Sequence, residues 1–452
     1  MTAALQARAI PEMMRHVAVL AAPAAAGPDY PAVEIHERRA DIGAPLVRSG
    51  TGCEYLSPMP AMNPSFAATI AATTPWILTP IIASLRMARS TSLDAESVQP
   101  PADPPRVSVI VPARNESRNI AACLQSILAS SYPKLKVIAV NDHSTDDTAV
   151  IARAIVSTDP RLTVLDNPDL PADWFGKQWA CQTGADAASG EILVFMDADA
   201  RAAPDLIVRS VNGMLRTHAD FYSVLGRQEM ITFWERLLQM QVFTVLVTRF
   251  GGTEIVNRSR SASAKIANGQ YLMVHRATYD EFGGHGLVRG YVAEDLMLAQ
   301  RYFELGKKTV LVEGIDQLST RMYTSLAELM GGWRKNLFAG GRHSMPFGGR
   351  AAWLAPLLLP LPFLMQLAPP LLLVVAVVFR IPALELWGAI TTAVTLLTWL
   401  AYYRVARVPM LYALLFPLGA GVTLYITLSA VLRGSRVEWK GREYQSVHPA
   451  NP

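Results

Sequence analysis

The sequence predicts an α/β domain with a doubly wound, mostly parallel sheet, followed by helices that cross a membrane. Between Arg106 and about Leu318, short apolar runs alternate with helical patterns, which is typical of βαβ units around a parallel sheet. From Ala351 onward the chain changes to long apolar segments with almost no charge. A third observation concerns a site, because the aspartates Asp197 and Asp199 directly follow one of the predicted strands.

The overall composition limits the kinds of protein that fit. The 452 residues suggest about two to four structural units. Hydrophobic residues make up 51% and charged residues 17%, below the share of about 25% that is typical for charged residues. The formal net charge of +4 is small, and the Lys and Arg residues form no basic stripe, which argues against a nucleic-acid partner. The three cysteines have no metal-ligand spacing and are typical of ordinary thiols in a reducing compartment.

The first ninety residues are predicted to lie outside the α/β domain. Residues 1–62 are rich in Ala and Pro, which indicates a disordered lead-in. Residues 63–90 contain Phe66–Leu85, an uncharged stretch long enough to span a bilayer. Arg86 and Arg89 follow it and favour a cytoplasmic position for its C-terminal end. A buried or interfacial segment is the alternative.

The predicted α/β domain spans residues 106–345 and follows a polar, Pro-rich linker at 91–105. Its first half contains short apolar runs that end in polar residues, as expected for buried parallel strands. The segments between these runs have helical patterns. The predicted strands are 107–113, 136–142, 162–166 and 192–199, and the predicted helices are 117–129, 146–157 and 178–188.

Residues 346–432 are predicted to form about three transmembrane helices, with a cytoplasmic tail at 433–452. Three segments, 351–379, 383–403 and 408–432, contain at most one charged residue each and are long enough to cross a membrane. Arginines follow both the second and the third segment, which favours a cytoplasmic location after each of them. Three simple crossings cannot satisfy both, so a hairpin, a re-entrant segment or an exceptional tail remain alternatives.

Polar residues follow three of the predicted strands at the point where each strand ends. Ligands of open α/β sheets bind at this edge, and carboxylates there suit a hard divalent cation that binds phosphates. No Gly-x-Gly-x-x-Gly follows the first strand and no Walker loop is present, which argues against a dinucleotide oxidoreductase and a P-loop NTPase. The three polar groups lie within 114–116, 142–146 and 197–199.

These segments, VSVIVPARNE, VNDHSTDDT and FMDADA, resemble family 2 glycosyltransferases with a GT-A fold, over about residues 104–345. The resemblance implies a nucleotide-sugar donor, most often a UDP-sugar, and Mg²⁺ or Mn²⁺. It implies that Asp199 binds the metal, whereas Asp146 is explained by a turn or helix-cap role. It also assigns donor contacts, with Asp197 at the ribose and diphosphate, to Pro112, Arg114, Glu116, Asp142 and Asp197.

Two further motifs complete the predicted site. Lys177 lies between strands that lead to a diphosphate site, where an ammonium group can act on phosphate, and similar lipid-directed enzymes have a Gly-Lys here. Glu294 and Asp295 open a predicted helix, where two acids also suit the helix macrodipole. The resemblance implies that an Asp of this motif, Asp295, is the general base of an inverting transfer, because the acceptor hydroxyl must lose its proton as it attacks.

A third motif, Gly331–Asn336, bears on the acceptor. It lacks the Gln-x-x-Arg-Trp of many processive members and instead resembles hopanoid-associated and carotenoid lipid glycosyltransferases. An interfacial helix, with Trp333 at the headgroups and Arg334 and Lys335 on anionic lipid, is the other explanation. His285 is explained equally well by contact with donor or acceptor and by a turn.

The sequence thus predicts a membrane-anchored, metal-dependent, inverting glycosyltransferase of the cell inner (plasma) membrane. It is expected to move one sugar from a nucleotide-sugar to a lipid-like hydroxyl at the cytoplasmic face. A processive polysaccharide synthase is the alternative among enzymes, and a nucleotidyltransferase would leave the Glu-Asp motif without a role. A membrane-bound nucleotide-sugar binding or scaffold protein is the alternative without turnover. The sugar, the acceptor and the oligomeric state are not determined by the sequence.

Overall fold

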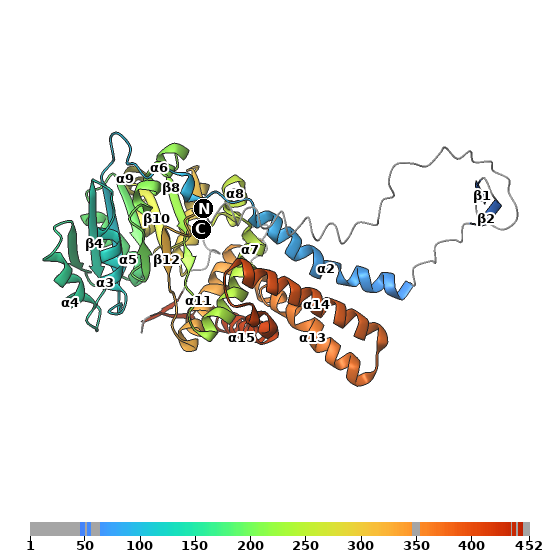
Figure 1. Ribbon diagram of the computed structural model, residues 1–452. Helices are drawn as coiled ribbons and strands as arrows, with labels where there is room; N and C mark the ends of the chain where they lie inside the picture. Colours follow the sequence, from blue (N-terminus) through green and yellow to red (C-terminus); the bar gives the residue numbers. More distant parts are fainter. Residues whose placement is uncertain are drawn as a thin grey trace. The chain divides into compact units, whose positions relative to one another are not determined.

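The computed structural model describes residues 46–49, 52–55, 64–345, 353–434, 436–439 and 442–445 (Figure 1). Most of the predicted lead-in at 1–62 and half of the predicted tail at 433–452 therefore lie outside the described residues. Each of the two segments contains an antiparallel hairpin among its described residues. Their strands are β1 (Leu46–Ser49), β2 (Gly52–Tyr55), β13 (Arg436–Trp439) and β14 (Arg442–Gln445).

The chain divides into two compact units. The first contains residues Met1–Leu78 and Pro369–Val394, and the second contains Thr79–Ala368 and Thr395–Pro452. In the described part of the second unit, a seven-stranded sheet has the order β11-β8-β10-β6-β3-β4-β5. Its strands are β3 (Val107–Ala113), β4 (Leu135–Asn141), β5 (Leu162–Asp166), β6 (Ile192–Met196), β8 (Phe221–Leu225), β10 (Tyr271–His275) and β11 (Thr309–Glu313).

The predicted doubly wound, mostly parallel sheet is confirmed. Strands β6, β3, β4 and β5 pair in parallel, as do β11 and β8, whereas β10 is antiparallel to both of its neighbours. The four predicted strands are all present, and the first predicted helix begins later than expected, at Ile120 rather than 117. Because β10 runs against its neighbours, the loop before it lies at the edge where the parallel strands end.

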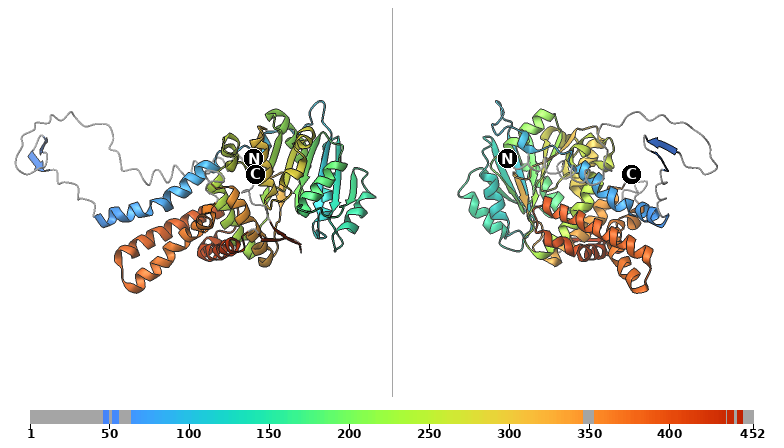
Figure 2. Two further views of the ribbon diagram at one scale, coloured as in Figure 1. Left: turned by 180° about the vertical axis from the view of Figure 1, so that it is seen from behind. Right: turned by 45° about the vertical axis from the view of Figure 1, so that its right-hand side comes forward.

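Helices cover both faces of this sheet (Figures 1 and 2). Side chains alternate between the faces along a strand. On β6, Val194 packs on one face of the sheet, here called the first face, and Leu193 and Phe195 pack on the opposite, second face. Asp197 continues the second series, so the strand directs it toward the α5 and α10 side. The first face carries α3 (Ile120–Leu128), α4 (Thr148–Val156) and α6 (Leu206–Thr217), and the second carries α5 (Gly176–Ala187), α9 (Arg276–Glu281) and α10 (Glu294–Glu304).

Helix α5 lies unusually close to the sheet. A Cβ atom added to Gly184 would lie 2.4 Å from Cγ2 of Ile110 on β3. A larger residue at this position would displace Ile110, so Gly184 allows α5 to pack closely on β3 and β4. The distance of α5, which also carries Lys177, from the sheet therefore depends partly on this glycine.

A small second sheet begins directly after β6 in the chain. It consists of β7 (Ala200–Ala202), β12 (Leu318–Thr320) and β9 (Arg227–Gln228), in the order β7-β12-β9. The chain turns from β6 into β7 through Asp197–Asp199, and the amide of Ala200 donates to the Asp197 carbonyl at 3.1 Å. The two aspartates therefore lie on either side of a turn between sheets.

Four helical segments pack together beside this junction. Helix α11 (Leu326–His343) joins α7 (Met240–Phe250), α15 (Phe416–Arg433) and the π-helical segment η2 (Glu235–Gln239). Their shared apolar cluster includes Leu237, Leu329, Trp333 and Ile426. Connecting segments are η1 (Leu93–Ala95), α8 (Thr253–Arg258), η3 (Ala262–Ala264) and η4 (Gly284–Val288).

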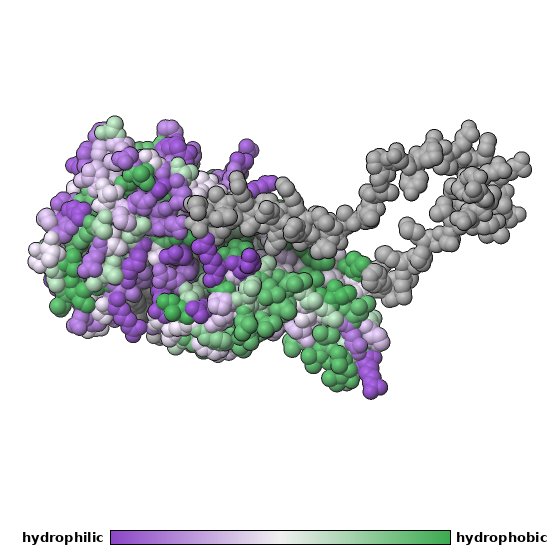
Figure 3. All heavy atoms as spheres, viewed as in Figure 1, coloured by the Kyte–Doolittle hydropathy of each residue, from purple (hydrophilic) through white to green (hydrophobic). Residues whose placement is uncertain are grey.

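Among the described residues, four helical stretches are long and apolar enough to cross a membrane. They agree with the predicted N-terminal segment and the three predicted C-terminal ones. The surface of the C-terminal helices is rich in exposed apolar side chains, including Leu371, Val374, Val378 and Phe379 (Figure 3). The stretches are Ala68–Met87 in α2 (Pro64–Met87), Ala355–Phe379 in α12 (Ala355–Leu358) and α13 (Leu361–Phe379), α14 (Pro382–Val405), and Met410–Arg433 in η6 (Met410–Leu415) and α15.

The last turn of α2 is bound to the α/β domain. The guanidinium of Arg86 donates to the carbonyls of Thr248, Arg249 and Phe250 at 3.2–3.3 Å. These carbonyls belong to the C-terminal turn of α7, where a helix leaves its last carbonyls without intrahelical partners. Arg86 therefore caps α7 with a charge that suits the negative end of its dipole.

Candidate functional site

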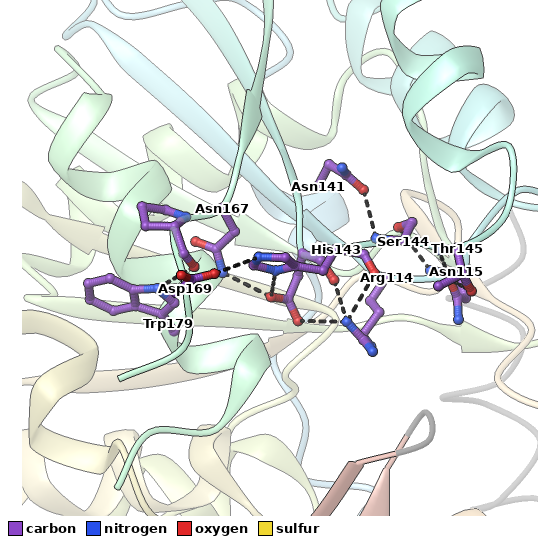
Figure 4. A network of polar contacts seen from close by, with 11 residues as sticks. Arg114, Asn115, Asn141, His143, Ser144, Thr145, Asn167, Asp169 and Trp179 are labelled. Carbon is purple, nitrogen blue, oxygen red and sulfur yellow. Dashed lines mark hydrogen bonds and ion pairs between the residues drawn. The ribbon is translucent and has the colours of Figure 1, made fainter. Parts of the chain in front are cut away.

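The loops after β3 and β4 form the first half of the site. Ala113 pairs with Asn141, so the two loops start side by side. Each contains a left-handed residue, Asn115 with φ 52° and His143 with φ 51°, which is uncommon for residues other than glycine. The amide of Asn115 donates to Ser144 Oγ at 3.1 Å, and the amide of Thr145 donates to Asn115 Oδ1 at 2.8 Å (Figure 4). The loops therefore hold each other in their turned conformation.

Asp142 lies at the centre of this half and is 2% exposed. Its Oδ1 accepts from Asn167 Nδ2 at 3.0 Å and lies 3.4 Å from His143 Nδ1. Arg114 Nη1 donates to the Asp142 carbonyl at 2.7 Å and lies 3.9 Å from its Oδ2 (Figure 4). The carboxylate is covered by its neighbours and fixes the direction of Arg114. Asp142 stays a predicted nucleotide contact.

The remaining residues of these loops are anchored by hydrogen bonds. Glu116 donates its amide to Thr148 Oγ1 at 2.7 Å, and its Oε2 accepts from Asn119 at 2.9 Å. Asp146 accepts from Thr148 and Ser117. Slight burial opposes ionisation of Asp146, but these hydrogen bonds lower its pKa to about 2. Asp146 therefore holds the turn before α4, the role that the sequence favoured.

A charged cluster forms the second half of the site. Lys177 Nζ lies 2.7 Å from Asp197 Oδ1 and 2.7 Å from Glu294 Oε1. The three side chains come from the start of α5, the end of β6 and the start of α10, and each is no more than 26% exposed. Burial alone would lower the pKa of Lys177, but the carboxylates of Asp197 and Glu294 hold it well above the ordinary value. Lys177 therefore remains charged and neutralises two carboxylates.

Asp295 lies next to this cluster with a different ionisation. Its Oδ2 accepts from the amide of Gly269 at 2.8 Å, and its Oδ1 accepts from the amide of Leu296 at 2.7 Å. Burial and the charge of Glu294 raise the pKa of Asp295 to about 6. A Cβ atom on Gly269 would lie 2.9 Å from Asp295 Oδ2, so the close approach requires glycine. Asp295 is therefore a buried carboxylate that can exchange a proton only about one unit below neutral pH.

Asp199 has different surroundings from Asp197. Burial and the Asp199 charge raise the pKa of the Tyr323 hydroxyl, which places Asp199 near the segment that leads into α11. Cys123, buried behind the turn, contacts the Asp197 carbonyl through its Sγ at 3.6 Å. Within the Asp-x-Asp pair, Asp197 therefore pairs with Lys177, whereas the charge of Asp199 acts on Tyr323.

The residues of this site fit a divalent cation only in one way. The described part of the chain contains no group of three or more His, Cys, Asp or Glu side chains that could hold a metal ion. Mg²⁺ commonly binds one or two carboxylates and takes its other ligands from substrate phosphates and water. Asp199, beside the Lys177–Asp197 pair, fits that arrangement, whereas a closed protein cage does not fit. Any metal here would accompany a bound phosphate.

Two residues outside the predicted site set, His285 and Lys335, lie near the charged cluster. His285 is 1% exposed, and its Nδ1 lies 2.7 Å from the Tyr279 hydroxyl. Burial lowers the pKa of His285 to about 3, so it is a neutral core residue behind the cluster. Lys335 on α11 interacts electrostatically with Glu294 and Asp197. The sequence signal for Lys335 was its place in the Gly331–Asn336 motif, which pointed to the acceptor or to lipid.

The comparison with known proteins agrees with this geometry. Residues 108–283 match the model of the family described as Glycosyl transferase family 2. The chain contains a glycosyl transferase family 2 domain. The matched region begins in β3 and ends after α9, so it includes the loops around Asp142 and the lysine cluster except for its α10 residues. Together with the strand order, the match confirms the GT-A-type sheet that the resemblance implied.

Two curated relatives are similar to 53% of the chain. Both are 4,4'-diaponeurosporenoate glycosyltransferases, from Staphylococcus haemolyticus strain JCSC1435 with 26% identity and from Staphylococcus aureus strain MRSA252 with 28% identity, each over 243 residues. The aligned region spans 63% of the length of each relative.

Solved structures show a more distant similarity. A mannosyltransferase from Pyrobaculum calidifontis, in complex with GDP-Man and Mn²⁺, has a TM-score of 0.49 and 22% identity, over 81% of this chain and 96% of that one. A glucosyl-3-phosphoglycerate synthase from Mycobacterium tuberculosis, in complex with Mn²⁺, UDP and glucosyl-3-phosphoglycerate, has a TM-score of 0.35 and 22% identity, over 56% of this chain and 79% of that one.

Proposed function

We propose that the protein is an inverting glycosyltransferase that transfers one sugar from a nucleotide-sugar to a lipid-like acceptor at a membrane. The observation that carries the proposal is the cluster in which Lys177 pairs with Asp197 and Glu294 at 2.7 Å, beside a carboxylate whose pKa is about 6. The family 2 domain supports the reaction type. The similarity to diaponeurosporenoate glycosyltransferases, together with the apolar helices, supports an apolar acceptor.

The loops after β3 and β4 are proposed to bind the nucleotide, and their internal contacts support this assignment. Arg114 is held in place by Asp142, and both loops are locked to one another by hydrogen bonds. Pre-ordered donors of this kind bind a ligand at a lower entropic cost. The resemblance implies that the donor is a UDP-sugar. We assign contacts with this donor to Pro112, Arg114, Glu116, Asp142, Lys177 and Asp197.

Asp295 is proposed to act as the general base, with Glu294 beside it. As the acceptor hydroxyl attacks the anomeric carbon, its proton moves to a carboxylate oxygen of Asp295. The new carbon–oxygen bond forms while the bond to the diphosphate breaks, and the nucleoside diphosphate leaves with the bonding electrons. A base with a pKa near 6 is deprotonated at neutral pH and still accepts a proton in the transition state. The Gly269 amide holds this carboxylate in place.

Asp199 is proposed to hold Mg²⁺ or Mn²⁺ together with the donor. When bound, a divalent cation neutralises negative charge on the diphosphate. Lys177 belongs to the same region and contributes a fixed positive charge. Its pairing with Asp197 and Glu294 keeps the ammonium oriented before substrate binds.

The enzyme is proposed to be a multi-pass protein of the inner (plasma) membrane with a cytoplasmic catalytic domain. The support is the set of four apolar stretches and the arginines Arg86 and Arg89 at the end of the first of them. Helix α15 packs against α11 through an apolar cluster. A hydrophobic acceptor in the bilayer would thereby meet a catalytic domain held at the membrane surface.

The experiment that tests the proposal uses the full chain in membranes, with UDP- and GDP-sugars and Mg²⁺ or Mn²⁺. Release of nucleoside diphosphate, and a lipid whose mass rises by one hexose or hexosamine, are the expected results. Asp199→Ala and Asp295→Asn should abolish both. A polymeric product would instead indicate a processive synthase. Binding of a nucleotide-sugar with no release of nucleoside diphosphate, and with no effect of Asp295→Asn, would indicate a binding protein.

A further inference from the structure

The inference rests on the proposed function and concerns helix α11, which spans the site from one half to the other. Near its start, Glu328 Oε1 lies 3.9 Å from Arg118 Nη1, and Arg118 follows the β3 loop. At its end, the His343 ring lies 5.7 Å from that of Tyr291, just before α10. The His343 carbonyl also accepts from Gln300 Nε2 on α10 at 3.3 Å. The middle of α11 must therefore pass over the region between these segments.

The periodicity of α11 places Lys335 on the face that looks toward the site. Leu326, Leu329, Met330, Trp333 and Leu337 form an apolar stripe against η2, α7 and α15. Residues seven apart lie on one side of a helix, two turns from each other. Lys335 is seven residues after Glu328 and eight before His343, so it lies between the two contacts with the site's segments and away from the apolar stripe.

The electrostatic surroundings of Lys335 agree with this placement. Burial lowers the pKa of Lys335 below its ordinary value of 10.5, and the charge of Lys177 lowers it further. The charges of Glu294, Asp197 and Asp295 act in the opposite direction and favour the charged form. All four groups belong to the charged half of the site. The preceding residue, Arg334, points elsewhere, and its Nε donates to Ser429 Oγ on α15 at 3.0 Å. Arg334 thus contacts the apolar helix α15, whereas the next residue, Lys335, faces the site.

The charge balance of the site indicates what Lys335 contributes. The carboxylates of Asp197, Glu294 and Asp295 share a region with two lysines, Lys177 and Lys335. Lys177 already pairs with two of these carboxylates at 2.7 Å. A donor brings two further negative charges on its diphosphate, and the attraction or repulsion of such groups is strong in a partly desolvated site. Lys335 is the second fixed cation that these side chains provide.

We propose that Lys335 contacts the diphosphate of the donor and stabilises the nucleoside diphosphate as it leaves. It would be a further catalytic residue, supplied by the helix that packs on α15. The lysine of the Gly331–Asn336 motif would then serve the donor, whereas Trp333 and Arg334 fix the helix against the apolar segments.

Binding of nucleotides that differ only in the second phosphate tests this proposal. The full chain in detergent with Mg²⁺ is titrated with UDP and UMP, and with GDP and GMP. Lys335→Met should weaken diphosphate binding by about tenfold or more, the effect expected for loss of one charged hydrogen bond, and leave monophosphate binding within about twofold. Lys335→Arg should restore most of the affinity for the diphosphate. Lys136→Met, at an exposed site on β4, is the matched control and should change neither.

The outcomes separate this proposal from the proposed function. An unchanged ratio of diphosphate to monophosphate affinity in Lys335→Met overturns it, as does a change confined to the KM of a lipid acceptor. If the wild-type protein binds none of the four nucleotides, the proposed function itself is wrong and the inference falls with it. A thermal unfolding curve of Lys335→Met that matches wild type shows that the change in binding is not caused by misfolding.

Discussion

Asp142 and Asp197 follow two strands of one sheet, β4 and β6, but their carboxylates are held in different ways. Asp142 is 2% exposed and is held by Arg114, His143 and Asn167, in a network that extends through two locked loops. Asp197 shares the single ammonium of Lys177 with Glu294. The first arrangement fixes geometry through many hydrogen bonds, and the second balances charge through ion pairs with Lys177. The two halves should therefore fail differently when one member is removed.

The largest effect is expected at the charged half for Asp295→Asn. Loss of a general base lowers turnover by about 10²–10⁴-fold, measured as release of nucleoside diphosphate. The same substitution, Asp295→Asn, is expected to increase the stability of the folded protein. The pKa of Asp295 is raised to about 6, so its favourable contribution to folding is present below the unfolded pKa and is lost as pH rises through 6. At pH 8 the uncharged variant should unfold at a higher temperature than wild type, and a lower unfolding temperature would contradict the assigned burial.

The next effect is expected for Lys177→Met, which leaves Asp197 and Glu294 without their shared cation. Breaking a buried ion pair by removing one partner costs about 3–5 kcal/mol, and the partial exposure of these side chains places the expected loss near about 3 kcal/mol. Chemical unfolding in detergent measures it, with Lys136→Met as the control. An unchanged free energy of unfolding would mean that the cluster does not depend on this ammonium.

A smaller effect is expected from pH. Asp295 acts as a base only when deprotonated, so kcat/KM should fall as pH decreases through about 6 and be about tenfold lower one unit below that value. Rates measured between pH 5 and 8, at saturating metal, test this. An activity that is flat across this range, or that rises toward acid pH, would assign the base to another group.

The smallest effect is expected at the other half, for Asp142→Asn. The amide oxygen can still accept from Asn167, and the hydrogen bond from Arg114 goes to the backbone carbonyl, so the loops should keep their conformation. The loss of charge beside Arg114 should cost about 1 kcal/mol of stability and raise the donor KM severalfold with little change in kcat. A loss of activity as large as that of Asp295→Asn would remove the distinction between the two halves.

Much of the sheet could be predicted because its strands are short apolar runs with polar ends. β3 and β5 match the predicted ranges residue for residue. The direction of β10 could not be predicted, because antiparallel pairing with β6 and β8 depends on partners far away in the sequence. That direction brings Gly269 to Asp295. Local sequence patterns therefore predict where a strand lies in the chain more readily than which strands it pairs with in the sheet.

The candidate site shows the same limit. Sequence motifs pointed to Lys177, Asp197, Glu294 and Asp295, and the structure brings these four together. Their roles remain predictions. The sequence did not indicate that Asp142 would be covered, nor that α11 would turn Lys335 toward the cluster, because both depend on how separate elements pack. The Asp197–Asp199 pair is close in sequence, yet a turn between two sheets gives its members different neighbours.

The cap that Arg86 places on α7 has a consequence for how the protein is made. Arg86 leaves the ribosome long before the carbonyls of Thr248, Arg249 and Phe250, and domains generally fold as synthesis proceeds from the N-terminus. If α2 crosses a bilayer as proposed, it is inserted before α7 has been synthesised. The α/β domain would then complete its folding while tethered to the lipid surface, so biogenesis and attachment would be a single process.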